Sequence, residues 1–430
     1  MGRIGKGIRM YERALRDDAK RRLARIGRAD VVVGIPSHRN GRTIREVAHA
    51  VARGISTYLA DRRVVLMSSD GGSSDNTVRQ VSEVRVSPNV QKLLTVYRGA
   101  LGKGRAIRAI LEAAGRLHAK ACAVIEARAP GIVPEWIPRL VNPVVGGRDL
   151  TVGCYQRSAY AAALTDNIVY PFMRMLFRRD LRDPLAGEFC LSGALASELA
   201  ARDVWETDVA RFGFNAWLAI QALTGELDLS QVDLGYRGEG GGQPGALPDA
   251  RFVHMIGTLF RCLTTHRHVW QRKAPLRRVP FDGGRQPDRI APCPDCAGVL
   301  IDAVHRSQGK YLRQWQMVLS PETLRGVLDT LTQPRRTFDF PAPLWARVVL
   351  EFALVYNRGE GDPDKVADAL LPLFYARAAA YVRATHDLTP AQRETAVAEV
   401  LRAFLDSKPF LDEKWDNYQP WMDTSGYWAM

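Results

Sequence analysis

The chain has 430 residues, of which 46% are hydrophobic and 25% are charged, so it is long enough for two or three domains. No run of about 18 apolar residues is free of charges, which excludes a membrane-spanning helix. The basic N-terminus lacks the apolar core of a secretory signal. Six cysteines are too few for a disulfide framework, so a cytoplasmic protein is expected.

The formal net charge of +14 is concentrated in two segments. Residues 1–30 carry ten Lys and Arg against four acids, and residues 261–290 carry eight against two, a net +6 in each. Such segments attract anionic substrates or an anionic membrane surface, so a peripheral membrane contact is one expectation. A solvated leader and a solvated loop are the alternative. Nucleic acid is not expected as a partner, because interleaved aromatic residues for stacking are missing.

Short apolar runs alternate with helical patterns in the first half of the chain. Strands are predicted at 31–35, 64–67, 93–97 and 121–125, with helices at 44–51, 75–82, 103–117 and 134–141. This order predicts a mainly parallel α/β sheet covered on both faces, with ligands beyond the carboxyl ends of the strands.

The pattern changes near residue 251. Long helical patterns dominate from there, as at 345–357 and 364–384, and strand-like runs vanish. The last residues contain Trp415, Trp421 and Trp428, which are expected to dock on the rest of the chain. The predicted parts are a basic helical leader (1–29), an α/β nucleotide-binding domain (30–250) and an all-helical C-terminal domain (251–430).

The segment Ser68-Ser-Asp-Gly-Gly-Ser-Ser-Asp-Asn-Thr77 directly follows the second predicted strand. Small residues after Asp70 let the backbone approach a flat ligand, and the Asp70 carboxylate can accept hydrogen bonds from a nucleotide base. Asp75 or Ser74 can cap the following helix. A turn with a helix cap explains the same residues without a ligand, so both interpretations stay open.

The order of these segments resembles glycosyltransferases of the GT-A fold. The first strand leads into Pro36-Ser-His-Arg-Asn40, the second into the Asp70 segment, and Gly102-Lys103-Gly104 opens a helix. Asp183-Pro-Leu-Ala-Gly-Glu-Phe189 is similar to a Pro-Leu-Gly-Gly-Glu segment of the mannosylglycerate synthase and glucosyl-3-phosphoglycerate synthase family, whose members are retaining enzymes. The resemblance covers roughly residues 30–385 and implies a GT-A domain with a mixed, Rossmann-like sheet, followed by helices.

The resemblance also implies roles for single residues. Pro36 and Asp70 would line the nucleotide base, and Lys103 would reach the base or the diphosphate. Glu126 occupies the first position of the family's Asp-x-Asp motif, which contacts the ribose and the metal-bound diphosphate. Farther along the chain, Glu188 would contact the donor sugar and Thr165 the carboxylate or phosphate of the acceptor.

Three positions depart from the family pattern. Arg128 replaces the second aspartate of the motif, Asn215 replaces a carboxylate near the reacting sugar, and Arg237 precedes Gly238 where a metal-binding histidine is expected. In one interpretation Arg128, helped by Lys103 or Arg105, clamps the diphosphate in place of the metal. In the other, the chain is an inactive homologue that binds a nucleotide sugar or a protein partner.

The predicted function is therefore retaining transfer of a hexose from a nucleotide-diphosphate sugar to a small anionic acceptor, such as glycerate or phosphoglycerate. Catalytic roles are predicted for Arg128, Asn215 and Glu188. No cofactor is expected; Mn²⁺ or Mg²⁺ is the alternative, although its ligand positions are substituted. A homo-oligomer is one expected assembly of this family. Cys293 and Cys296 could hold zinc, with reduced thiols as the alternative.

Overall fold

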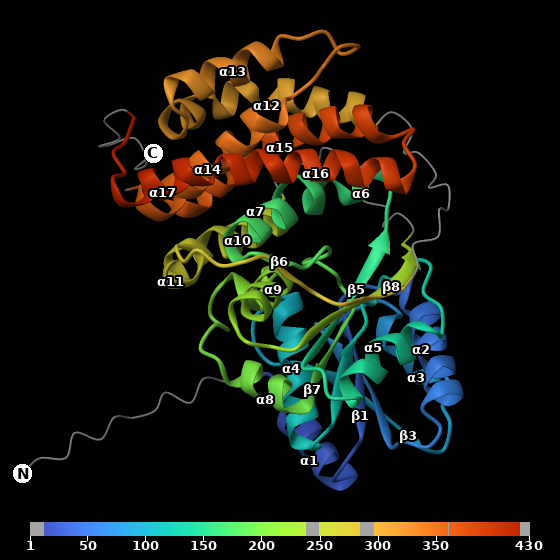
Figure 1. Ribbon diagram of the computed structural model, residues 1–430. Helices are drawn as coiled ribbons and strands as arrows, with labels where there is room; N and C mark the ends of the chain where they lie inside the picture. The colour runs from blue at the N-terminus through green and yellow to red at the C-terminus, as the bar shows by residue number, and fades with distance from the viewer. Residues whose placement is uncertain (1–12, 238–248, 284–295, 360, 422–430) are drawn as a thin grey trace, which may run out of the picture. The chain divides into compact units, whose positions relative to one another are not determined.

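The computed structural model describes residues 13–237, 249–283, 296–359 and 361–421 (Figure 1). The chain forms two compact units. The first contains the described residues up to Arg128 together with Val133–Gly147 and Cys190–Arg211. The second contains Ala129–Ile132, Arg148–Phe189 and the described residues from Phe212 onward. The domain boundaries predicted at residues 30 and 250 stay predictions.

The first unit is an α/β layer structure. Its elements are α1 (Asp17–Ile26), β1 (Val31–Ser37), α2 (Ile44–Tyr58), β2 (Val64–Asp70), α3 (Thr77–Glu83), β3 (Val90–Val96), α4 (Lys103–Arg116), β4 (Ala121–Val124), α5 (Trp136–Val145), most of β7 (Phe189–Ser192), α8 (Gly193–Ala201) and the 3₁₀ turn η2 (Asp208–Ala210). The strand order is β7-β4-β1-β2-β3, and β1 pairs in parallel with both β2 and β4, as β2 does with β3. The strands predicted from the first half of the sequence are confirmed.

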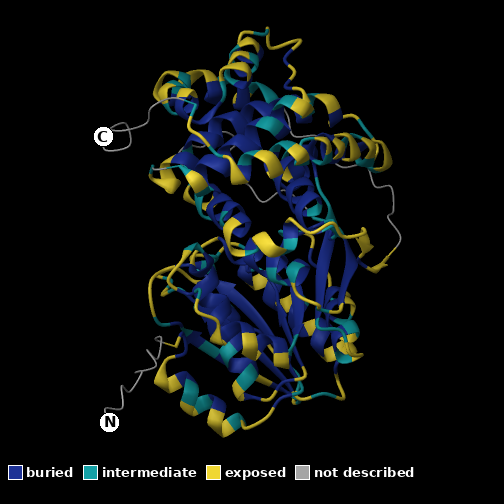
Figure 2. Cartoon of the chain, turned by 60° about the vertical axis from the view of Figure 1, so that its left-hand side comes forward, coloured by how far each residue is buried: buried dark blue, intermediate teal, exposed yellow. Residues whose placement is uncertain are grey.

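Continuous burial explains why β1 and β2 begin with runs of apolar residues. All seven residues of each strand are buried, as expected for parallel strands covered on both faces (Figure 2). Helix α4 packs so closely that a Cβ at Gly34 would lie 2.3 Å from Cγ2 of Ile110. The parallel register places Ser37 opposite Asp70, so polar residues gather at the carboxyl ends of the two strands.

The second unit combines strands with the long helices. Its elements are β5 (Leu150–Gln156), α6 (Ala159–Leu164), the π-helix η1 (Thr165–Val169), α7 (Tyr170–Phe177), β6 (Arg179–Asp180), α9 (Phe214–Thr224), β8 (Leu229–Tyr236), α10 (Ala250–Thr265), α11 (Arg267–Trp270), β9 (Arg277–Arg278), β10 (Phe281–Asp282), α12 (Cys296–Val318), α13 (Pro321–Leu331), α14 (Ala342–Arg358), α15 (Pro363–Thr385), α16 (Pro390–Asp406) and α17 (Lys408–Asp416). Strand β8 pairs in parallel with β5 and β10, and β6 with β9.

The α/β class with a helical C-terminal region is thereby confirmed. Helix α15 packs against α10, α12 and α14, while α16 packs against α7 and α14. The expectation that strands vanish after residue 251 is wrong for β9 and β10, which are two-residue strands formed by pairing with β6 and β8. Their sequence carries no apolar run because these strands are exposed.

The predicted docking of the aromatic tail is confirmed for Trp415, which is 2% exposed. Its ring lies edge-on to Trp270, with centroids 5.5 Å apart. Trp428 lies outside the described residues, as does Cys293, whereas Cys296 is buried at the start of α12. No helix in the described part of the chain has the length and apolarity needed to cross a membrane.

A buried carboxylate in α14 makes the stability of the helical region depend on pH. Glu351 is 2% exposed and accepts hydrogen bonds from Ser320 N (2.8 Å), Ser320 Oγ (2.9 Å) and Thr323 Oγ1 (2.8 Å). Burial raises the pKa of Glu351 above its ordinary 4.5, although these hydrogen bonds lower it.

The Glu351 carboxyl group of the folded chain keeps its proton to a higher pH than it does in the unfolded chain. Its contribution to the free energy of unfolding therefore falls as pH rises from 4.5 through the folded-state pKa. Relative to wild type, Glu351→Gln is expected to gain stability as pH is raised from about 4.5 to about 7. Urea unfolding of both proteins across this range measures the difference. A difference that is constant with pH would contradict the assignment.

Candidate functional site

Asp70 organises the carboxyl ends of β1 and β2 in the first unit. Its carboxylate, 1% exposed, accepts hydrogen bonds from Ser37 Oγ (2.9 Å), Ser73 N (2.6 Å) and Ser73 Oγ (2.7 Å). Pro36 is buried within β1, opposite Ser69 of β2. Asp70 therefore holds the turn that follows β2, as one of the two interpretations predicted. A role of Asp70 or Pro36 toward a nucleotide base stays a prediction.

The loop after β1 is bonded to the segment after β2. Its backbone amides donate to side-chain oxygens, from Arg39 to Ser73 (2.8 Å), from Asn40 to Thr77 (2.7 Å) and from Gly41 to Asp75 (3.0 Å). Asp75 also accepts from the amide of Thr77 (3.1 Å), so Asp75 rather than Ser74 accepts the hydrogen bond at the start of α3. These bonds hold Arg39 at φ 52°, a left-handed conformation that non-glycine residues rarely adopt.

Lys103 and Glu126 come together although they are far apart in sequence. The Lys103 ammonium forms an ion pair with the Glu126 carboxylate, and the two side chains are 23% and 24% exposed. Lys103 is the first residue of α4, and Glu126 follows the end of β4. Arg128, two residues farther on, is exposed. Two of the predicted donor-binding side chains are thus in contact, and Arg128 adds a positive charge to the same loop.

Arg105 does not serve the predicted clamp. Its guanidinium forms an ion pair with Glu206 (2.7 Å), and the side chain is 8% exposed. The neighbouring Tyr97 is buried, and its hydroxyl accepts a hydrogen bond from the Gly102 amide (3.0 Å). Burial raises the pKa of Tyr97. Arg105 and Tyr97 therefore stabilise the start of α4, and a role of Lys103 beside Arg128 stays a prediction.

The glycines of Gly102-Lys103-Gly104 permit close packing. The Gly104 amide donates to Arg211 O (2.9 Å), and a Cβ at Gly102 would lie 2.3 Å from Ala210 O. A Cβ at Gly104 would lie 1.9 Å from Val209 O. The backbone of residues 209–211 covers the first turn of α4 at both glycines. Lys103 therefore reaches the carboxyl edge of the sheet with its side chain rather than with its backbone.

Gly104→Ala is expected to lower the free energy of unfolding by about 1–3 kcal/mol, because the added methyl group meets backbone that can move little. Gly309→Ala is the matched control. Gly309 also lies within a helix, but its Cβ would meet no atom within 4 Å. This control is expected to stabilise the protein by up to about 1 kcal/mol, the helix propensity of alanine. Urea midpoints that shift in the same direction for both variants would contradict the close packing.

In the second unit, Asn215 and Glu188 stabilise the loop before β7. The Asn215 amide nitrogen donates to Ala186 O. Glu188 is fully buried and accepts hydrogen bonds from Arg237 Nη1 (2.8 Å) and from the Tyr155 hydroxyl. Burial and the Glu188 carboxylate raise the pKa of Tyr155. The sequence did not single out Tyr155 or this role of Arg237, because both residues reach Glu188 only through the pairing of β5 with β8.

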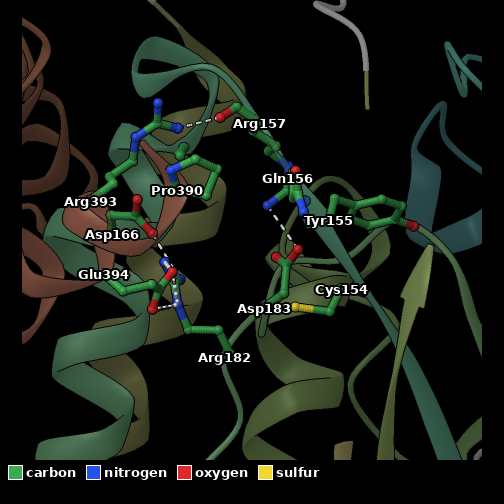
Figure 3. A pocket seen from close by; sticks show the side chains of 11 residues that line it. Cys154, Tyr155, Gln156, Arg157, Asp166, Arg182, Asp183, Pro390, Arg393 and Glu394 are labelled. Atoms are coloured by element: carbon green, nitrogen blue, oxygen red, sulfur yellow. Dashed lines mark hydrogen bonds and ion pairs between the residues drawn. The ribbon is translucent and has the colours of Figure 1, made fainter. Parts of the chain in front are cut away.

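Close by, Arg182 links two carboxylates at a charged cavity of about 50 Å³ (Figure 3). Its guanidinium lies 2.8 Å from Asp166 in η1 and 2.9 Å from Glu394 in α16. Burial works against the charge, but Asp166 and Glu394 outweigh it and raise the pKa of Arg182. Asp166 also accepts a hydrogen bond from the Tyr381 hydroxyl (2.7 Å) of α15. The ion pairs therefore tie η1 to the helical region.

Further charged groups line this cavity, and some of their polar atoms have no hydrogen-bond partner among the described residues. Arg157 forms an ion pair with Asp183 (2.8 Å), and Arg393 donates to the Arg157 carbonyl. Burial works against the Arg157 charge, but Asp183 outweighs it and raises the pKa of Arg157. Among the described residues, Arg393 Nε and Asp183 Oδ1 find no hydrogen-bond partner. A cavity of this size holds a few water molecules or a small hydroxylated ligand, which can satisfy both atoms.

Thr165 lies in the π-helix η1 and is 5% exposed. The next residue, Asp166, lines the charged cavity. The residue after it, Asn167, accepts from Arg377 (2.8 Å) with its side chain and from Trp345 with its carbonyl (2.6 Å). Short π-helical segments occur frequently at functional sites. The helical region thus fixes the segment in which the acceptor residue is predicted.

The residues of the Asp-x-Asp position do not fit a divalent cation. Glu126 is already paired with an ammonium, and Arg128 carries the wrong charge to ligate Mn²⁺ or Mg²⁺. Within the described ranges, no three His, Cys, Asp or Glu side chains gather closely enough to hold a metal ion. These positions hold Arg128 and the Lys103–Glu126 ion pair in place of a set of carboxylates.

Comparisons with protein-family models and with curated proteins give no match. Among solved structures, glucosyl-3-phosphoglycerate synthase from Mycobacterium tuberculosis with Mn²⁺, UDP and glucosyl-3-phosphoglycerate is similar with a TM-score of 0.41 and 20% identity, covering 56% of this chain and 81% of that chain. The same enzyme in complex with Mn²⁺, UDP-glucose and phosphoglyceric acid is similar with a TM-score of 0.40 and 19% identity, covering 59% of this chain and 85% of that chain. Its complex with Mg²⁺ and UDP has a TM-score of 0.40 and 20% identity, and the match covers 58% of this chain and 84% of that chain.

Proposed function

We propose that this chain is a GT-A glycosyltransferase that moves a hexose, with retention, from a nucleotide-diphosphate sugar to a small anionic acceptor. The observation that carries the proposal is the Lys103–Glu126 ion pair just beyond β4, two residues before the exposed Arg128. Asp70 ends β2 at the same edge of the parallel sheet. Ligands of parallel α/β sheets bind at this edge. The order of motifs along the sequence supports the same function.

In the proposed reaction Arg128 and Lys103 bind the diphosphate of the donor. A guanidinium can bind two phosphate oxygens at once, and it stabilises the negative charge that develops as the sugar bond breaks. Lys103, positioned by its ion pair with Glu126, adds a second cationic hydrogen-bond donor. In a retaining transfer the departing phosphate oxygen can itself take the acceptor proton, so a neutral Asn215 is compatible with the reaction.

The acceptor is proposed to bind in the second unit, near Thr165 and the charged cavity. Arg393 Nε is a donor there without a partner among the described residues, and an acceptor carboxylate or phosphate could accept from it. Asp183 Oδ1, the unsatisfied acceptor, could receive a hydroxyl hydrogen. The small size of the cavity favours a short molecule such as glycerate.

An inactive homologue that only binds a nucleotide sugar is the second candidate. It is favoured by Glu188, which is fully buried and bonded to Arg237 and Tyr155, and by Asn215, which is bonded to Ala186. Calorimetry with a panel of nucleotide-diphosphate sugars, with and without Mn²⁺ and a chelator, separates the candidates when followed by a transfer assay. Binding that survives the chelator, followed by transfer, supports the enzyme. Binding without transfer supports the second candidate, and no binding contradicts both.

Asp70→Ala and Ser73→Ala separate a base contact from a turn contact. Both variants lose the hydrogen bond from the Ser73 hydroxyl to the Asp70 carboxylate. Only Asp70→Ala removes the carboxylate itself, and with it the hydrogen bond from the Ser73 amide. Asp70→Ala is expected to weaken nucleotide affinity by about 1–3 kcal/mol, the cost of an unpaired buried polar group, and Ser73→Ala by clearly less. Calorimetry on both proteins measures this. Equal losses would show that Asp70 acts only by holding the turn.

A further inference from the structure

The amino ends of β1, β2 and β4 lie together at one edge of the first unit, because β1 pairs in parallel with both other strands. Backbone hydrogen bonds join the segments that lead into these strands. The Asp30 amide donates to Arg63 O (2.7 Å), and the Lys120 amide donates to Asp30 O (2.9 Å). We name the surface of these segments the amino-edge face; its residues are 25–30, 61–63 and 116–120.

The amino-edge face carries a surplus of positive charge. Its cations are Arg25, Arg28, Arg62, Arg63, Arg116 and Lys120, and its acids are Asp30 and Asp61, which gives a net charge of +4. Each acid already has a cation beside it, since Asp30 pairs with Arg63 (3.5 Å) and Asp61 with Arg62 (4.0 Å). The Arg63 amide lowers the pKa of Asp30, although burial raises it, and the charges of Arg63 and Lys120 lower it further.

Four cations of the face remain, all exposed and without an ion pair in the described part of the chain: Arg25, Arg28, Arg116 and Lys120. Other cations near the start of the chain are engaged elsewhere. Lys20 pairs with Asp17 (2.7 Å), and Arg22 donates to Leu94 O (2.9 Å). The structure thus separates the cations that hold the fold together from those that face solvent.

Helix ends account for only part of this charge. Helices α1, α2, α3 and α4 each end just before a strand begins, so their carboxyl ends lie at this edge. Each such end carries about half a negative charge, and Arg25 and Arg116 lie in last turns where they offset it. The sum over these helices is smaller than the net charge of the face, so a positive surplus remains.

We propose that the amino-edge face binds an anionic membrane surface. Its unpaired cations come from separate segments and end in long side chains, which suits an extended array of lipid phosphates rather than one small anion. The three segments contain no Phe, Tyr or Trp, the residues on which nucleic-acid bases stack. This inference is independent of the proposed transfer reaction, whose site lies at the opposite ends of strands seven residues long.

Cosedimentation of the full chain with lipid vesicles tests the proposal. Wild type is expected to bind phosphatidylcholine vesicles that contain phosphatidylglycerol, but not vesicles of phosphatidylcholine alone. The triple variant Arg28→Gln, Arg116→Gln, Lys120→Gln is expected to bind the anionic vesicles about a hundredfold more weakly, because each cation near such a surface contributes roughly fivefold. Added salt is expected to release wild type, since it screens exposed charges.

The matched control is the triple variant Arg306→Gln, Arg325→Gln, Arg402→Gln. These arginines are exposed on α12, α13 and α16 of the second unit, and their loss changes the net charge equally. The control is expected to bind anionic vesicles as wild type does. Equal losses in the two triple variants would point to net charge alone and contradict the proposal.

Three further outcomes would overturn the assignment. Wild type could fail to bind anionic vesicles, or bind them with no dependence on salt. The Arg28, Arg116 and Lys120 variant could melt at a lower temperature yet keep its vesicle affinity, which would assign these cations to the helix ends. Finally, wild type could bind a DNA duplex more tightly than the vesicles, which would identify a nucleic acid as the partner.

Discussion

Replacing Arg128 with alanine is expected to lower the rate of hexose transfer by about 10²–10³-fold, the effect of removing one group that stabilises the charge of a transition state. Arg128 is exposed and lies in a loop beyond β4, so the melting temperature is expected to stay unchanged. Initial rates with saturating donor, together with thermal unfolding, measure both effects.

Arg85→Ala is the matched control for this prediction. Arg85 is also an exposed arginine of the first unit, but it follows α3 rather than a strand at the ligand-binding edge. This control is expected to retain full activity. Full turnover by Arg128→Ala would show that a guanidinium at this position does not replace the metal ion. Equal losses in the two variants would point to a general charge effect.

Replacing Arg182 with methionine is expected to destabilise the protein by about 3–5 kcal/mol, because it leaves carboxylates at the charged cavity without their cation. Asp166 is 1% exposed and would keep only the Tyr381 hydroxyl among the partners described above. Chemical denaturation followed by fluorescence measures the loss as a shift of the midpoint.

The control for Arg182→Met is Arg202→Met. Arg202 forms an ion pair with Glu198 on the surface of α8, where both side chains are more than half exposed. Exposed pairs of this kind contribute about 0.3–0.5 kcal/mol, so this midpoint is expected to move little. If the denaturation midpoint of Arg182→Met also moved little, water or a rearranged side chain would have to replace the cation beside the Asp166 carboxylate.

Local sequence predicts the strands and the turns that follow them, but not the ion pairs between distant segments. Strands β1, β2 and β4 were predictable because a parallel strand buried on both faces must be continuously apolar. The turn at Asp70 was predictable because a short carboxylate can accept from the amide three residues ahead. The partner of Arg105 was not, since Glu206 lies 101 positions away and no sequence pattern connects the two.

The same limit explains the glycines around Lys103. Glycine before and within the first turn of a helix is consistent with a phosphate-binding loop and with close packing alike. The structure shows backbone of residues 209–211 against both glycines, so packing accounts for them. The role of Lys103 consequently depends on its side chain and on Glu126.

The amino-acid sequence by itself determined the α/β and helical parts and the polar segments that follow the strands. These features depend on residues close together in the chain, where periodicity and turn chemistry act. Only the tertiary structure decided which charges neutralise each other. Arg182 meets Glu394 across 212 positions, and Arg278 remains without an ion pair in the described chain. Ion pairing depends on distance in space, which the order of residues does not encode locally.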